Sequence, residues 1–148
     1  KTTHADYVSQ IPGVSPEDVY EKFVSDPTTF FKAAGLTVRP ETGRLQNGSR
    51  LMLEMEGTPD VWFPIEVRLD PAMRQVNIST LDGHALMGTN QFNFVDDGNG
   101  GTRINQITHF QLSSTAVELG TGVDELERQH TTWIRGHGYL FEQFYPRD

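Results

Sequence analysis

The central part of the chain alternates apolar and polar residues with a period of two, and this alternation constrains the fold more than any other feature. It runs from residue 36 to residue 112 and is interrupted by short stretches rich in glycine, asparagine, aspartate and proline, which favour turns. The interruptions fall at 46–48, 57–59, 70–71, 82–83 and 96–101. They divide the region into six predicted strands, and strands joined by tight turns indicate an antiparallel sheet.

The alternation also separates two faces of this predicted sheet. One face is apolar: Leu51, Leu53, Met55, Val61, Phe63, Ile65, Val67, Leu69, Val76, Ile78, Phe92, Phe94, Ile104, Phe110 and Leu112. The other face is polar: Glu54, Glu56, Glu66, Arg68, Gln75, Asn77, Arg103 and Asn105. An alternation of this kind predicts one face turned toward the core and one toward water.

Two short helices are predicted between a first strand at 7–11 and this region. The segment SPEDVYEKFVS begins with Ser15 as a helix N-cap and Pro16 at the first helical position. Asp26 and the proline after it repeat the pattern and open a second short helix, which Gly35 is expected to end. The predicted order is therefore one strand, two short helices and six strands.

A longer amphipathic helix is predicted near the C-terminus, in ELERQHTTWIRGHGYLFEQFY. At 100° per residue, one arc of about 120° collects the apolar side chains and two histidines. The members of this arc are Val123, Leu126, His130, Trp133, Ile134, His137, Leu140, Phe141 and Phe144. We expect the helix to lay this arc on the apolar face of the sheet, because we predict no other segment able to cover that face.

Composition bounds the class of protein. A chain of 148 residues with 36% hydrophobic content is expected to form one domain, 1–148. The net charge of −8, without a cluster of Lys or Arg, argues against nucleic acid as a partner. The absence of cysteine excludes disulfides and thiolate metal sites, and no apolar run is long enough to predict a membrane span.

The compartment and the oligomeric state do not follow from these features. Because the first residue is Lys1 rather than Met, we expect processing or trimming at the N-terminus. The cytoplasm is the default compartment, and a removed signal peptide would instead indicate a periplasmic or secreted protein.

The whole pattern resembles the START/Bet v 1-like superfamily, also called SRPBCC, which includes polyketide cyclase/dehydrase-like proteins. The resemblance rests on the order of elements and on four local segments: YVSQIPGVSPEDVYEKF, NGSR at 47–50, IEVRLDP at 65–71 and GNGGTRI at 98–104. It implies an α+β helix-grip fold, in which a seven-stranded curved antiparallel sheet surrounds the long C-terminal helix. It further implies a cavity between sheet and helix for a hydrophobic or amphipathic small molecule.

The superfamily spans several functions, so three hypotheses follow. The chain binds or carries a hydrophobic small molecule, or it is a cyclase, dehydratase or isomerase acting on a polyketide-like or other small hydrophobic substrate, or it is a protein-interaction module. The polar outer face of the sheet argues against the third. No cofactor is expected.

His130 and His137 are the candidate catalytic residues. They are seven residues apart, so both lie on the apolar arc, roughly 10 Å apart along the helix axis. Histidines that share a metal on a helix normally lie three or four residues apart, so we predict no metal site. The two alternatives are general acid/base or ligand-binding roles, and buried neutral histidines bonded to polar groups of the sheet.

Candidate ligand-binding residues come from both elements. Four polar residues share the parity of the apolar face of the sheet: Thr80, Asn90, Gln106 and Thr108. The aromatic candidates are Phe92, Phe110, Trp133 and Phe141. Polar groups in an apolar cavity orient a small molecule, although they could also pair with one another or with water.

Other chemistry-bearing residues receive structural interpretations. His109 has the parity of the polar face and is predicted to be exposed, and His84 lies in a turn. Glu54 and Glu56 are predicted to be surface charges. A serine-hydrolase site is not indicated, because the chain has no Gly-x-Ser-x-Gly segment.

Overall fold

The computed structural model describes residues 3–33, 36–39, 43–55, 62–81 and 86–112. The predicted C-terminal helix lies outside these residues, and so do its candidate site residues His130, Trp133, His137 and Phe141. Within the described part, the chain runs through one strand, two helices and six further strands, which is the predicted order.

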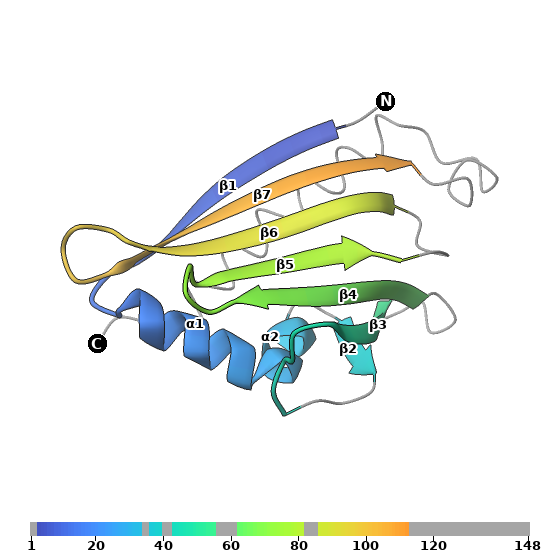
Figure 1. Ribbon diagram of the computed structural model, residues 1–148, viewed down its shortest axis with the longest axis horizontal. Helices are drawn as coiled ribbons and strands as arrows, with labels where there is room; N and C mark the ends of the chain where they lie inside the picture. The colour runs from blue at the N-terminus through green and yellow to red at the C-terminus, as the bar shows by residue number, and fades with distance from the viewer. Residues whose placement is uncertain (1–2, 34–35, 40–42, 56–61, 82–85, 113–148) are drawn as a thin grey trace.

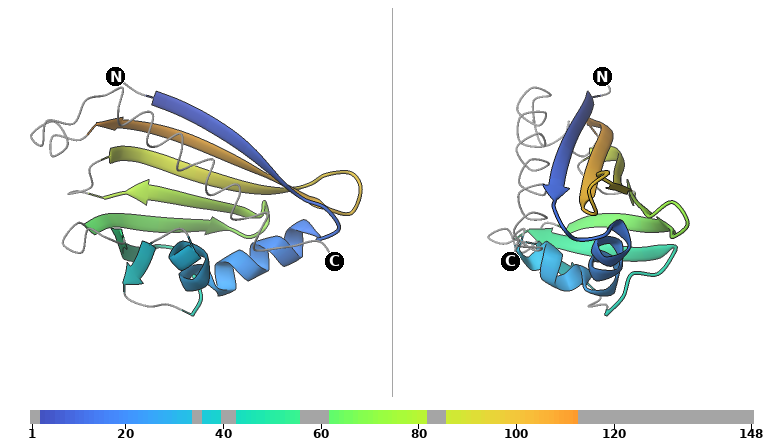
Figure 2. Two further views of the ribbon diagram at one scale, coloured as in Figure 1. Left: turned by 180° about the vertical axis from the view of Figure 1, so that it is seen from behind. Right: turned by 90° about the vertical axis from the view of Figure 1, so that its left-hand side faces the viewer.

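Seven strands form one antiparallel sheet. They are β1 (Thr3–Ile11), β2 (Leu36–Arg39), β3 (Ser49–Met55), β4 (Trp62–Asp70), β5 (Gln75–Thr80), β6 (Leu86–Asp96) and β7 (Thr102–Leu112). Their order across the sheet is β1-β7-β6-β5-β4-β3-β2, with β1 and β2 at the two edges. Figure 1 shows β1, β7, β6, β5 and β4 side by side, and the end-on view in Figure 2 shows the sheet curving between β7 and β4. The predicted curved antiparallel sheet is confirmed.

The first strand begins four residues earlier than the sequence predicts. It spans Thr3–Ile11 and pairs along its full length with β7, from Thr3 opposite Phe110 to Ile11 opposite Thr102. The residues before Tyr7 include His4 and Asp6, which lack the apolar character expected of a strand. Pairing with a neighbouring strand therefore extends β1 beyond its local apolar pattern.

The faces of the sheet agree with the parity read from the sequence. Buried side chains lie on the predicted apolar face in every strand from β3 to β7: Leu51, Leu53, Ile65, Val67, Val76, Phe92, Phe94 and Ile104. The alternate positions Arg68, Arg103 and His109 are exposed. We call the buried side the inner face and the opposite side the outer face.

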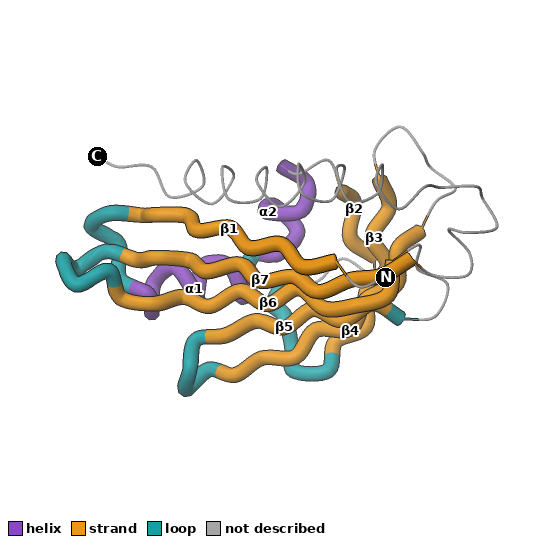
Figure 3. Tube along the Cα trace, turned by 90° about the horizontal axis from the view of Figure 1, so that it is seen from above, coloured by secondary structure: helices purple, strands orange, loops and turns teal. Residues whose placement is uncertain are grey.

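Two helices follow β1: α1 (Pro16–Ser25) and α2 (Pro27–Ala33). The backbone N–H of Asp18 donates to the Ser15 side chain at 3.2 Å, and that of Thr29 donates to the Asp26 carboxylate at 3.3 Å. Both predicted caps are confirmed, and each satisfies a backbone donor that the first helical turn would leave free. Viewed from above, α2 lies next to β2, the strand at one edge of the sheet (Figure 3).

Helix α1 covers one end of the inner face. The Phe23 ring, fully buried, lies 5.7 Å from the Phe92 ring and 6.0 Å from the Phe94 ring, and Tyr20 meets Phe94 edge-on at 5.7 Å. The expectation that only the C-terminal helix could cover this face is therefore wrong at this end. The apolar stripe of α1 is short, but it carries two aromatic residues, and these bury enough area to close the end of the sheet.

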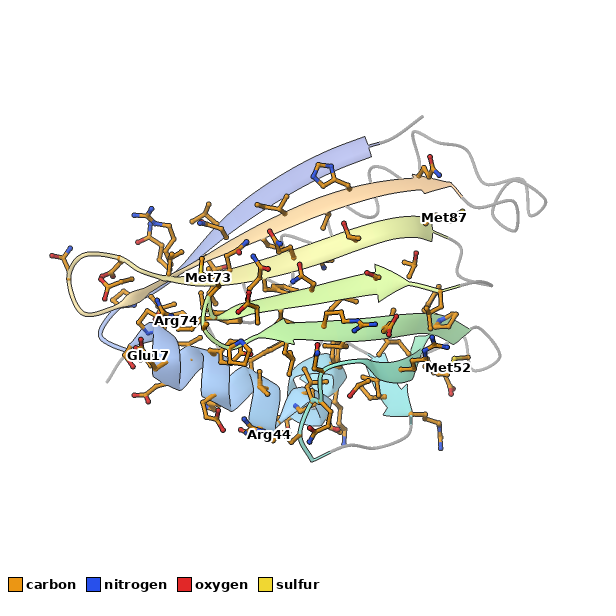
Figure 4. The ribbon with its side chains drawn as sticks, viewed as in Figure 1. Glu17, Arg44, Met52, Met73, Arg74 and Met87 are labelled. Carbon is orange, nitrogen blue, oxygen red and sulfur yellow. The ribbon has the colours of Figure 1, made fainter. Side chains whose placement is uncertain are left out.

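Two ion pairs attach α1 to neighbouring segments. The Arg74 guanidinium donates to Glu17 at 3.0 Å and to the backbone carbonyl of Phe94 at 3.3 Å, which joins the β4–β5 turn to the start of the helix. Arg44 forms a two-pronged contact with Glu21 farther along α1. Figure 4 shows both arginines beside the helix. These contacts link α1 to its neighbouring segments, and because each pair is exposed, we expect each to contribute little to stability.

Candidate functional site

The candidate site lies on the inner face, where three adjacent strands bring polar side chains into an apolar surface. In the register of β5, β6 and β7, Ile78 lies opposite Asn90, and Asn90 lies opposite Thr108. One step nearer α1, Val76 lies opposite Phe92, and Phe92 lies opposite Gln106. The sheet thus brings Asn90, Gln106 and Thr108 together, as their shared parity predicts.

Two of the polar candidates, Gln106 and Asn90, carry a carboxamide, and Gln106 is the more deeply buried of the two. Its side chain is 2% exposed, and neither Nε2 nor Oε1 makes a hydrogen bond with the part of the chain that the structure describes. A buried polar group without a partner costs on the order of 1–3 kcal/mol of folding free energy. A carboxamide in this state has both its donor and its acceptor free for a bound group.

Asn90 is in a similar state on the adjacent strand. Its Oδ1 atom is buried and makes no hydrogen bond with the described residues. Asn90 and Gln106 are diagonal neighbours across the β6–β7 pair, because Asn90 lies opposite Thr108. Diagonal positions in an antiparallel pair have their Cα atoms roughly 7–8 Å apart, so one small polar group can reach both side chains.

The other two polar candidates differ from this pair. The Thr80 hydroxyl accepts from the Gly88 N–H at 2.9 Å and donates to the Gly88 carbonyl at 3.4 Å, so it extends the pairing of β5 with β6. Thr108 is fully buried between Ala5 and Asn90 in the register. Thr80 is therefore committed to the backbone, and a role for it at the ligand stays a prediction.

The carboxamides of the outer face show the opposite behaviour. Four of them form a closed ring between β5 and β6: Gln75 donates to Asn93 at 2.7 Å, Asn93 to Gln91 at 3.2 Å, Gln91 to Asn77 at 2.8 Å, and Asn77 to Gln75 at 2.9 Å. Within the ring each amide donates once and accepts once, and Asn93 also donates to the backbone carbonyl of Asn105 at 3.5 Å. The same two strands thus satisfy their outer carboxamides with each other, whereas Asn90 on the inner face keeps an unpaired oxygen.

The aromatic candidates among the described residues are Phe92 and Phe110. Phe92 is 1% exposed and packs against Phe23 of α1, which makes it a core residue. Phe110 lies opposite Gly88 in the sheet, at the end of β7 away from α1. Direct ligand contact by either remains a prediction, as it does for Trp133 and Phe141, which lie outside the described residues.

Two buried polar groups near the site were not singled out from the sequence. Ser9 is 2% exposed and lies opposite Ile104, so it faces inward from β1. The Tyr20 hydroxyl is buried without a partner among the described residues, and burial raises the pKa of this phenol above its usual value. Ser9 could have been identified from the sequence, because it is two residues from Ile11 on the same strand and so shares its face. Tyr20 could have been identified because it is three residues from Phe23 on the same face of α1.

Charge is nearly absent from the part of the inner face that the structure describes. In the described strands, the positions of inward parity carry no Asp, Glu, Lys, Arg or His except Asp96, at the exposed end of β6. Among all the residues that the structure describes, no group of three or more His, Cys, Asp or Glu could hold a metal ion. Neither of the two described helices is long and apolar enough to cross a membrane. The described surface suits an uncharged, largely apolar molecule that carries a hydrogen-bonding group.

No protein-family model matches the sequence, and no curated protein matches it either. Solved structures are similar in fold. Ara h 8.0201 is 14% identical, with a TM-score of 0.70, over 98% of this chain and 98% of its own. The ZhuI aromatase/cyclase from Streptomyces sp. R1128 is 10% identical, with a TM-score of 0.69, over 96% of this chain and 89% of its own. Norcoclaurine synthase from Thalictrum flavum, in complex with dopamine and hydroxybenzaldehyde, is 12% identical, with a TM-score of 0.63, over 100% of this chain and 89% of its own.

The chain has the Bet v 1-like helix-grip fold. At 10–14% identity the likeness shows the fold alone. It confirms the fold class that the sequence predicts. Within the Bet v 1-like fold of this chain, the inner face of the sheet carries the buried carboxamides, and α1 closes one end of that face.

Proposed function

We propose that this protein binds a hydrophobic or amphipathic small molecule between the inner face of the sheet and the C-terminal helix. The observation that carries the proposal is the Gln106 carboxamide, buried in an apolar surface with both hydrogen-bonding atoms unpaired in the described structure. Such a group is costly to folding unless a bound molecule completes it. A ligand site typically combines a mostly apolar lining with a few polar groups of this kind.

The structural neighbours support the same proposal at a coarser level. One of them was solved with dopamine and hydroxybenzaldehyde bound, which are small aromatic molecules. Because the shared fold carries different functions in different proteins, this likeness supports binding of a small molecule without identifying it.

The test uses N-phenyl-1-naphthylamine, an uncharged apolar dye whose fluorescence rises in an apolar environment. We expect a saturable increase with one dye per chain. Replacing Ile78 on the inner face by Trp should weaken dye binding about tenfold or more, because the larger side chain fills the site. The matched control Ile107→Trp places the same side chain on the outer face of β7 and should leave binding unchanged. Equal effects of both substitutions would contradict the proposed location.

An enzymatic function is the second candidate, and it is favoured by the names of two neighbours, an aromatase/cyclase and norcoclaurine synthase. In this proposal His137 or His130 acts as acid or base, and Asn90 or Gln106 polarises a carbonyl of the substrate. If a ligand of the protein is converted, His130→Ala or His137→Ala should lower kcat by about 100-fold or more. Unchanged turnover in both variants would contradict the assignment.

A further inference from the structure

We propose that Gln106 and Asn90 form a hydroxyl-recognition pair, so that the protein selects an uncharged, hydroxyl-bearing apolar molecule over the ketone of the same skeleton. The inference deepens the proposed function and rests on it. It concerns the chemical group that the ligand presents to the sheet, and it follows from the hydrogen-bonding capacity left open on the inner face.

The first step is the state of Gln106. A carboxamide has a donor end and an acceptor end, and in Gln106 both ends are buried and unpaired in the described structure. Rotating the amide by half a turn exchanges the two ends but leaves the same two requirements. A partner must therefore be able to donate as well as accept, whichever way the amide is oriented.

The second step is the choice of ligand group. A hydroxyl donates one hydrogen bond and accepts others, so it can accept the amide N–H of Gln106 and donate to one of the two buried oxygens, Oε1 of Gln106 or Oδ1 of Asn90. A ketone oxygen only accepts, so it satisfies the amide N–H and leaves the amide oxygen of Gln106 and Oδ1 of Asn90 unpaired. A site that hydrogen-bonds a hydroxyl rejects an analogue without it, because its own buried polar groups are then left unpaired.

The third step excludes an ionic head group. A carboxylate or an ammonium needs an opposite charge or many dipoles when it is taken out of water. In the described strands the inward positions that neighbour Gln106 and Asn90 include Tyr7, Ile78, Phe92 and Thr108, none of which carries a charge. The pair therefore fits a neutral hydroxyl better than a fatty-acid carboxylate.

The outer face of the sheet shows that carboxamides on neighbouring strands are able to pair with one another. On β5 and β6, four carboxamides close a ring of hydrogen bonds with one another. Gln106 and Asn90 are diagonal neighbours on β6 and β7, yet neither completes the other. Both side chains therefore keep hydrogen-bonding capacity that a third group could use.

The experiment measures the affinity of the full chain for three probes of one bicyclic skeleton: 1-tetralol, 1-tetralone and tetralin. Isothermal titration calorimetry gives the three dissociation constants. We expect 1-tetralol to bind at least about tenfold more tightly than 1-tetralone, since one additional buried group is paired. Equal affinities for the alcohol and the ketone would overturn the inference, while leaving the proposed function standing.

Substitutions then locate the preference. Gln106→Met keeps the side-chain length and removes the amide, so it should reduce the alcohol-to-ketone preference to less than about threefold. Asn90→Leu should also reduce it. The matched control Gln111→Met makes the same exchange at an exposed position on the outer face of β7 and should retain the full preference.

Thermal unfolding separates recognition from a structural role. Because Gln106→Met removes a buried group without a partner, the ligand-free variant should melt at or above the temperature of the unsubstituted protein. A lower melting temperature together with an unchanged alcohol preference would mean that Gln106 stabilises the fold instead, and would overturn the inference. Failure of all three probes to bind would overturn both the inference and the proposed function.

Discussion

At the scale of single residues, Gly101 is a position where the β6–β7 hairpin packs closely against the segment after β1. A Cβ added there would lie 2.9 Å from the Cα of Pro12 and 3.0 Å from the backbone nitrogen of Gly13, and it would also collide with the Asp97 carboxylate. Backbone atoms cannot move aside as a flexible side chain can. The absence of a side chain at this position lets the hairpin pack against the turn that leads into α1.

We therefore predict that Gly101→Ala lowers the free energy of unfolding by about 1–3 kcal/mol, the usual cost of overpacking. Urea denaturation measures this difference. Gly43→Ala is the matched control, because a Cβ at Gly43 would meet no atom within 4 Å. An equal loss of stability in the two variants would show that the close approach at Gly101 is not the cause.

Asp97 gives a prediction about pH. Its carboxylate accepts the backbone N–H of Asn99 at 2.7 Å and of Gly101 at 2.9 Å, and these bonds, the first above all, lower the pKa of Asp97 below its usual 3.8. Because the folded-state pKa is below the unfolded one, the ionised carboxylate stabilises the fold above about pH 3.8, and this contribution is lost as the pH falls through the folded-state pKa.

The variant Asp97→Asn should accordingly be less stable than the unsubstituted protein at pH 7, and the gap should narrow as the pH falls below 3.8. Urea unfolding at a series of pH values measures the gap, and a carboxyl NMR titration should place the midpoint for Asp97 below 3.8. A gap that is constant with pH, or a midpoint above that value, would contradict the assigned role of the two backbone N–H groups.

At the scale of elements, helix α1 closes the end of the inner face through Phe23. We predict that Phe23→Ala lowers the free energy of unfolding by about 3–5 kcal/mol, because it leaves a cavity between α1 and the rings of Phe92 and Phe94. Lys22→Ala, at an exposed position on the same helix, should change it by less than about 0.5 kcal/mol. A small effect at Phe23 would mean that α1 adds little to the core.

The sequence predicts the elements well because each has a local cause. Alternation identifies the strands, and Ser15 and Asp26 mark the helix starts. The role of α1 as a cover could not be predicted in the same way, because it depends on which face of the sheet the turn after β1 directs the helix toward. The outer ring of Gln75, Asn77, Gln91 and Asn93 likewise depends on the register of β5 and β6, which a single sequence does not specify.

In the candidate site, too, the sequence predicts the features that have a local cause and not those that depend on contacts between strands. Parity alone placed Asn90, Gln106 and Thr108 on one face, and their positions in the sheet agree. Parity could not show that Thr80 bonds to the backbone of Gly88, or that Gln106 lacks a partner among the described residues, since these depend on distances between strands. The histidines of the predicted C-terminal helix lie outside the described residues, so their roles stay predictions.

At the scale of the whole molecule, the exposed methionines do not mark a second binding surface. Met52, Met73 and Met87 are exposed, but they lie on three separate parts of the structure, on β3, on the β4–β5 turn and on β6 (Figure 4). Single exposed apolar side chains are ordinary on protein surfaces, whereas a binding surface needs a continuous patch. These three methionines therefore form no continuous apolar patch among the described residues.

Methyl NMR compares the two faces of the sheet in one experiment. In a sample with labelled isoleucine methyl groups, 1-tetralol is titrated into the full chain. Ile78 on the inner face lies opposite Asn90, and Ile107 on the outer face lies opposite Gln91. We predict that the Ile78 methyl resonance shifts progressively and saturates, while that of Ile107 stays within a tenth of that shift. A dominant shift at Ile107, or no shift at either residue up to the solubility limit of the probe, would contradict binding at the inner face.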